Sequence, residues 1–108
     1  MQLNDYQKLA LRTARPKTAD NELMHLLLGL VGESGEIAEK VKKVIRDQNS
    51  DFSKLDELFE KELGDVLWHI AVLANYFDIS LEKIAQQNID KLASRLERGK
   101  IGGSGDDR

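Results

Sequence analysis

Apolar side chains recur every three or four residues through most of this chain, and no segment alternates apolar and polar residues with a period of two. There is one proline, Pro16, and four of the eight glycines lie in the last ten residues, so little interrupts the pattern in between. A sheet has no candidate strands, and the sequence predicts an all-α fold. We expect four helices, at residues 4–15, 22–46, 54–77 and 81–98.

Residue types at the expected helix ends support these bounds. Asn4, Asn21, Ser53 and Ser80 carry side chains that accept hydrogen bonds from the first turn of a helix, so we assign them as N-caps. Gly99 is a natural C-terminal stop, because glycine adopts the left-handed conformation that ends many helices.

The connections between the helices are short, which favours a four-helix, bundle-like arrangement in one domain. That domain is expected to span residues 1–98 and to be followed by a glycine-rich tail at residues 99–108. The two middle helices carry apolar residues around more than half of their circumference, more than one small core can cover. We therefore expect a homo-oligomer.

Composition excludes several classes of protein. The chain has no cysteine, which excludes a disulfide scaffold, a thiolate metal site and a cysteine nucleophile. Its net charge of −3 gives no electrostatic footprint for a nucleic acid polymer. The longest apolar run, residues 26–32, is far shorter than the ~20 residues of a membrane span. The first ten residues lack the order of a secretory signal, so a cytoplasmic location is expected.

Two pairs of acids stand out because of the side of the helix on which they lie. Glu62 falls in the middle of an apolar stripe, and Asp65 is rotated only ~60° from it and lies ~4.5 Å further along the axis. Glu33 and Glu36 have the same spacing at the border of the apolar arc of the preceding helix. Both pairs are therefore predicted to face inward.

Burying an unpaired carboxylate costs several kcal/mol, and clustering such groups adds repulsion, so these four acids need protons or cations. Their combined charge of about −4 is equal in size and opposite in sign to that of two divalent cations. A ligand set of oxygens, with no thiolate and little imidazole, favours Mg²⁺ or Mn²⁺ over zinc or copper.

Glycines inside the predicted helices support this interpretation, since each costs about 1 kcal/mol relative to alanine. The missing side chains predict close approach of a partner helix, or of a ligand, to the backbone beside the acids. A tight helix crossing alone is the alternative. The glycines are Gly29, Gly32, Gly35 and Gly64.

Other residues near the acids have ordinary structural interpretations as well. Lys40 has the spacing of a solvated i,i+4 pair with Glu36. His25 and His69 are interpreted as satisfied core histidines rather than metal ligands, and Trp68 as a packing residue rather than a stacking platform.

The segments GLVGESGEIAEK and KELGDVLWHI together contain Glu-x-x-Glu, a spacer of 25 residues and Glu-x-x-Asp. At these residues the chain resembles the MazG-like, all-α nucleoside triphosphate pyrophosphohydrolases. The resemblance runs from about Leu3 to Arg98 and extends to the tail, which is similar to the C-termini of small single-domain members.

This resemblance implies Mg²⁺-dependent hydrolysis of a nucleoside triphosphate to the monophosphate and pyrophosphate, as removal of non-standard or excess nucleotides. It also implies a homodimer or a tetramer built as a dimer of dimers. Glu33, Glu36, Glu62 and Asp65 match the metal-binding positions of the family. Some relatives carry a further acid where this chain has Gly32, so the identity of the general base stays open.

Hydrolysis of a triphosphate requires neutralised phosphate oxygens and an aligned water. We expect the four acids to hold two or three Mg²⁺ ions, with Glu36 as the proton acceptor beside Glu33. Substrate contacts are expected from Lys40, Asn88, Lys91 and Arg95, and the tail is expected to fold over the ligand. The alternative for Lys91 and Arg95 is that they form a solvated edge of the helix. The alternative for the tail is disorder.

Two other classes of function compete with this hypothesis. One is a non-catalytic helical interaction module, or a nucleotide-binding regulatory module, that keeps the acids for a structural cation. The other is a di-metal redox bundle, which uses Glu-x-x-His on two helices. Only Glu22 and His25 have that spacing, because the residue three before His69 is Val66, so iron chemistry is not expected.

Overall fold

The computed structural model describes all 108 residues, and every regular element in it is helical. Helix α1 spans Leu3–Ala10 and continues into one 3₁₀ turn, η1, at Leu11–Thr13. The longer helices are α2 at Glu22–Asp47, α3 at Leu55–Tyr76 and α4 at Leu81–Glu97. The predicted all-α fold with four helices is confirmed.

Three of the four helices match their predicted bounds to within one residue, whereas the first is shorter. The α-helix ends at Ala10 instead of residue 15. The carbonyl of Ala10 accepts hydrogen bonds from the Thr13 hydroxyl and from the indole N–H of Trp68. These donors take the place of the next helical N–H and tighten the chain into a 3₁₀ turn.

Both ends of α4 follow the predicted signals. The Ser80 hydroxyl accepts a hydrogen bond from the backbone N–H of Lys83 at 3.1 Å. At the other end, Gly99 has a φ of 64°, and the N–H of Lys100 donates to the carbonyl of Arg95 at 2.7 Å. This bond to a carbonyl five residues back is the usual way in which a left-handed glycine closes a helix.

Two predicted N-caps are wrong. Helix α1 begins one residue before Asn4, and the carboxylate of Asp5 accepts from the backbone N–H of Gln2 at 3.1 Å. Asn4 is thereby left free to bond with another element. Helix α3 has Lys54 at its N-cap position, so Ser53 lies outside the helix.

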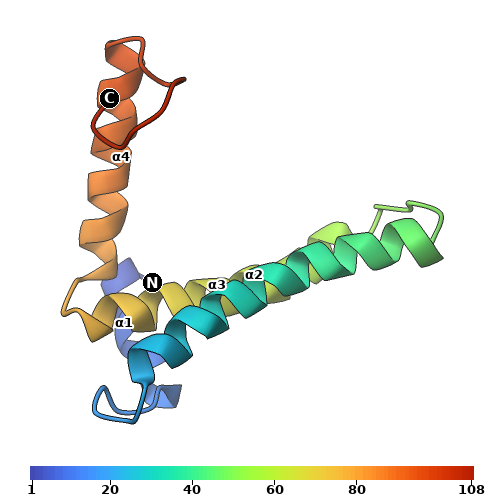
Figure 1. Cartoon of the computed structure of the whole chain (residues 1–108), viewed down its shortest axis with the longest axis horizontal. Helices are drawn as coiled ribbons and strands as arrows, with labels where there is room; N and C mark the ends of the chain where they lie inside the picture. Colours follow the sequence, from blue (N-terminus) through green and yellow to red (C-terminus); the bar gives the residue numbers. More distant parts are fainter.

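Helices α2 and α3 lie side by side as an antiparallel hairpin, joined by the link at residues 48–54 (Figure 1). The core sits at the end of the hairpin away from this link, where α1 packs against α3 and α4 begins. Its buried members come from all four helices: Ala10, Leu26, Ala71, Val72 and Leu81.

At this end of the hairpin, the side chain of Gln7 forms hydrogen bonds that connect three elements. Gln7 of α1 is buried, and its Nε2 donates to the carbonyls of Ala71 at 3.1 Å and Ile79 at 3.0 Å. Its Oε1 accepts from the N–H of Leu81, the first residue of α4, at 2.9 Å. This side chain therefore ties α1 to α3 and to the turn from which α4 departs.

Helix α4 stands away from the hairpin instead of lying along it (Figure 1). The radius of gyration is 17.0 Å, whereas a compact domain of this length has about 13 Å. Only eleven residues are buried, and the exposed large apolar side chains of α4 include Ile89, Leu92 and Leu96. The single chain is thus a four-helix domain with an open bundle, and its apolar surface is only partly covered.

The glycine-rich tail folds back onto the end of α4 (Figure 1). Arginine side chains hold the tail by donating hydrogen bonds to backbone carbonyls. Arg95 Nη2 donates to the carbonyl of Asp106 at 2.6 Å, and Arg98 Nη2 donates to that of Arg108 at 2.7 Å. The Arg108 guanidinium in turn donates to carbonyls at residues 100, 101, 102 and 105.

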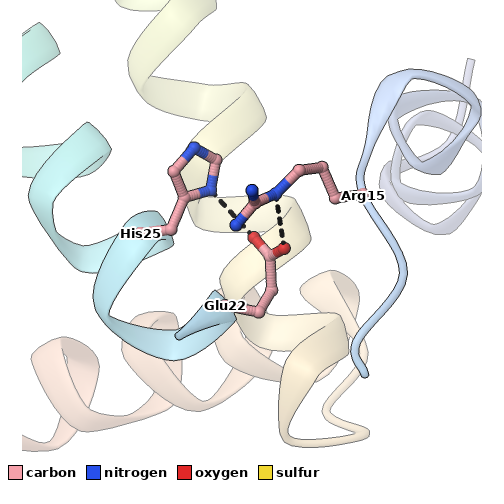
Figure 2. Close-up of polar contacts among 3 residues, drawn as sticks. All are labelled: Arg15, Glu22 and His25. Atoms are coloured by element: carbon pink, nitrogen blue, oxygen red, sulfur yellow. Dashed lines mark hydrogen bonds and ion pairs between the residues drawn. The ribbon is translucent and has the colours of Figure 1, made fainter. Parts of the chain in front are cut away.

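The start of α2 is fixed by a buried carboxylate, shown in Figure 2. Glu22 accepts from Arg15 Nε at one oxygen and lies against His25 Nδ1 at the other, both at 2.9 Å. The hydrogen bond from His25, followed by that from Arg15, lowers the pKa of Glu22. Asn21 occupies the predicted N-cap position with a left-handed φ of 56°, but its side chain makes no capping hydrogen bond.

The glycines inside the helices do not share one structural reason. A Cβ on Gly29 would lie 2.3 Å from Nε2 of His69, so any other residue there would force the imidazole on the facing helix to shift. Gly32, Gly35 and Gly64 have no atom within 4 Å of such a Cβ. The predicted close approach of a helix is therefore confirmed for Gly29 and is wrong for the other three within one chain.

None of the helices is both long enough and apolar enough to cross a membrane.

Candidate metal centre

The middle of the α2–α3 hairpin brings three of the four predicted acids together, and Glu36 is not in that group. Glu36 and Asp65 are exposed, so the prediction that both pairs face inward is wrong for these two residues. Carboxylate oxygens of Glu33, Glu62 and Asp65 all lie within 4.8 Å of one another. Glu33 comes from α2, and the other two come from successive turns of α3. The i,i+3 spacing on α3 and the antiparallel pairing of the helices therefore produce one convergent oxygen cluster.

Glu62 is the buried member of this cluster, with 5% of its surface exposed. Its Oε1 accepts from Nζ of Lys40, which reaches across from α2. Its Oε2 is buried without any hydrogen-bond partner. A buried carboxylate oxygen without a partner costs free energy, so this atom is an observation that favours a cation ligand.

Glu36 lies at the solvent side of the same site. The negative charge of Glu33, and then that of Glu62, raises the pKa of Glu36. The pKa of Lys40 is also raised, first by its hydrogen bond to Glu62. The site is therefore strongly negative, even with one ammonium in it.

The predicted i,i+4 pair between Glu36 and Lys40 is not formed. Lys40 turns instead toward Glu62 on the facing helix. The physical reason is that Glu36 is exposed and solvated, whereas Glu62 is buried and gains more from a positive partner.

Tyr6 is a neighbour of the site that the sequence did not single out. It is half-buried on α1 and packs against the core. Burial, and then the charge of Asp65, raises the pKa of its phenol. Tyr6 looked like an ordinary apolar-face residue, and only the crossing of α1 over α3 brings it within electrostatic reach of the acids.

Both histidines have hydrogen-bond partners, but neither is buried, and His25 is exposed, so the prediction of core histidines is wrong in that respect. His69 Nδ1 lies 2.9 Å from the carbonyl of Asp65, and because a carbonyl only accepts, this nitrogen carries the hydrogen. His25 pairs with Glu22 at the start of α2. Trp68 packs against the core and donates its indole N–H to α1, which confirms a packing role.

The α4 residues predicted to touch substrate do not reach the acids of their own chain. Asn88 and Lys91 line a hollow of about 300 Å³ whose other lining residues, Ile84 and Gln87, also belong to α4. Arg95 is buried, with Nη2 bound to tail carbonyls and Nε without a partner. Substrate binding by these residues stays a prediction, and in this arrangement it requires a second copy of the chain.

The residues present fit a divalent cation. The donor set consists of carboxylate oxygens, which Mg²⁺ and Mn²⁺ prefer, and it offers no thiolate. Glu62, whose Oε2 is buried without a hydrogen-bond partner, belongs to this set.

Comparison with known protein families agrees with this geometry. The profile described as "MazG nucleotide pyrophosphohydrolase domain" matches residues 21–99, most of the chain. The chain belongs to the MazG nucleotide pyrophosphohydrolase family. The matched part of this MazG domain holds α2, α3 and α4 and therefore both acid pairs, whereas α1 and most of the tail lie outside it.

Relatives of this MazG domain carry uninformative names. The Gene 37 protein of Mycobacterium phage L5 is 50% identical over 88 residues, which cover 80% of this chain and 76% of that protein. The uncharacterized protein YvdC of Bacillus subtilis is 36% identical over 75 residues, which cover 63% of this chain and 70% of that protein. No solved structure matches the chain.

Proposed function

We propose that this MazG domain hydrolyses nucleoside triphosphates to the monophosphate and pyrophosphate, with Mg²⁺ or Mn²⁺ as cofactor and nucleotide-pool house-cleaning as its role. The observations that carry the proposal are the convergence of three carboxylates and the buried oxygen without a partner on one of them, that of Glu62. Such a site can hold cations against phosphate oxygens, and membership of the family supplies the reaction class.

In this proposal the chain's own residues have separate roles. Glu33, Glu36, Glu62 and Asp65 hold the metal, which when bound neutralises phosphate charge and acidifies a water. Water adds to the α-phosphorus, the bond to the α–β bridging oxygen breaks, and pyrophosphate leaves with that oxygen. Glu36, beside Glu33, takes the proton of the water as general base.

A release assay tests this function. We expect the protein to form pyrophosphate from at least one nucleotide in a panel of canonical, deoxy and damaged triphosphates with Mg²⁺, and to form none in EDTA. The products should be equal amounts of monophosphate and pyrophosphate. If no triphosphate turns over with Mg²⁺ or Mn²⁺, while calorimetry detects ion or nucleotide binding, the chain is a non-catalytic regulatory or interaction module.

We further propose that the protein is a homodimer or a dimer of dimers. Support comes from the open shape of one chain and from exposed apolar side chains on α2 and α4, among them Leu28, Val31 and Leu96. A second copy that covers these faces would also place Asn88 and Lys91 near the acids of its partner. The chain has a mass of 12.2 kDa, and sedimentation should give at least twice that value. A monomer at micromolar concentration would contradict the proposal.

A further inference from the structure

Lys40 holds a position that an ordinary surface lysine does not. It is in the third quarter of α2, and its Nζ crosses to α3 and donates to Oε1 of Glu62. The lysine side chain is 35% exposed and the glutamate side chain 6%. One end of this ion pair is therefore in contact with water, and the other is inside the acid cluster.

The other ion pairs in the C-terminal half of α2 differ from this one. Lys42 pairs with Glu39, and Arg46 with Asp47, and all four side chains are about half exposed or more. Ion pairs between exposed side chains are screened by water and contribute little to the free energy of unfolding. Only the pair of Lys40 engages a carboxylate of the metal centre.

A divalent ion at this centre and the Lys40 ammonium need the same carboxylate. The three convergent acids include Glu62, and a cation held among them would lie close to the ammonium. Two positive charges at such short separation repel each other strongly in a partly buried site. Lys40 and the ion therefore cannot both bind Glu62 at full strength.

We infer that Lys40 is a built-in counter-cation of Glu62, and that repulsion from a divalent ion bound to this carboxylate displaces its ammonium from Oε1. This inference rests on the proposed function, because it concerns the metal site of that function. Lys40 keeps the buried carboxylate compensated, and it lowers the affinity of the site for the ion. Once released, its ammonium is available to a phosphate oxygen. The metal therefore binds before Lys40 makes the substrate contact predicted for it.

The test is metal binding by the variant Lys40→Met, measured by calorimetry on protein stripped with EDTA. Methionine keeps an unbranched side chain and removes the charge. We expect Lys40→Met to bind Mg²⁺ at least about fivefold more tightly than wild type, and to melt at a lower temperature in EDTA because Glu62 loses its partner. Lys43→Met removes the same charge from an exposed site three residues further along α2, and its affinity should stay within about twofold of wild type.

The outcomes separate this inference from the proposed function. If wild type binds Mg²⁺ and Lys40→Met binds it no more tightly, or if Lys43→Met has the same effect, Lys40 does not compete for Glu62. If wild type binds neither Mg²⁺ nor Mn²⁺, the proposed function fails instead.

A second measurement keeps the test decisive if Lys40→Met does not fold in EDTA. The ¹³Cε resonance of Lys40 in wild type should move on addition of Mg²⁺ toward the position of a free lysine. The resonance of Lys43 should stay in place. A Lys40 resonance that is unchanged at saturating Mg²⁺ overturns the inference.

Discussion

Glu62→Gln should lose turnover by at least about a hundredfold while the metal-free protein stays as stable as wild type or becomes more stable. A metal ligand in a triphosphate hydrolase supplies several kcal/mol of charge stabilisation, and each ~1.4 kcal/mol is a factor of ten in rate. The substitution removes a charge from a buried position but preserves the shape of the side chain. Pyrophosphate release with Mg²⁺ and thermal melting in EDTA measure the two effects.

The contacts of Glu62 explain why stability should survive. The amide oxygen of glutamine still accepts from Lys40, which is the one polar partner of the carboxylate. The amide nitrogen replaces the partnerless Oε2 with a donor, in a residue whose neighbours in the cluster are the carboxylates of Glu33 and Asp65. A neutral donor among like charges relieves both repulsion and desolvation.

Two comparisons make this prediction specific. Glu60→Gln changes an exposed acid two residues earlier on α3 and should leave both turnover and melting unchanged. Millimolar Mg²⁺ should raise the melting temperature of wild type and of Glu60→Gln, since a ligand of the native state stabilises it by mass action, but not that of Glu62→Gln. A large loss of melting temperature by Glu62→Gln in EDTA would show that Glu62 is a structural partner instead.

The acid cluster was predictable because the information in it is local. Glu33 with Glu36, and Glu62 with Asp65, share a helix face by their spacing alone, and the position of Glu62 in an apolar stripe predicts its burial. The structure confirms that burial and brings Glu33 to the α3 pair. Helical geometry is set by the backbone, so its consequences can be counted along a sequence.

Contacts between helices were harder to predict from the sequence, because they depend on how the helices are rotated against each other. The spacing of Lys40 favours Glu36, yet the lysine bonds to a residue 22 positions away on α3. Helix propensity likewise gives the cost of Gly29 and Gly32 but not what faces them. The imidazole of His69 faces the first, and nothing lies within 4 Å of a Cβ at the second.

The direction of α4 was beyond sequence reasoning for the same reason. Short connections favour a closed bundle, but the turn before α4 is held by the side chain of Gln7, more than 60 residues earlier in the chain. A single glutamine among apolar neighbours gave the only signal, and it indicates burial without naming partners. The open arrangement leaves large apolar side chains exposed.

Gln7→Ala should destabilise the protein by about 2–4 kcal/mol, the largest loss expected for a residue outside the metal centre. It leaves the carbonyls of Ala71 and Ile79 and the N–H of Leu81 without this partner, and an unsatisfied buried group costs about 1–3 kcal/mol. Urea unfolding followed by circular dichroism measures the loss, and an unchanged m-value would show that the unfolded state is unaffected. The melting temperature should fall by roughly 8 °C or more.

Asn4→Ala is the matched control, because it also removes side-chain hydrogen bonds between α1 and α4. Asn4 Nδ2 donates to Glu82 at 2.9 Å, but this bond is exposed, so water can replace the lost partner and the cost should stay below about 1 kcal/mol. Equal losses in the two variants would mean that burial does not strengthen the Gln7 contacts. If Gln7→Ala costs more, the start of α4 is fixed from α1. The placement of Asn88 and Lys91 relative to the acids then depends on a helix outside the matched MazG domain.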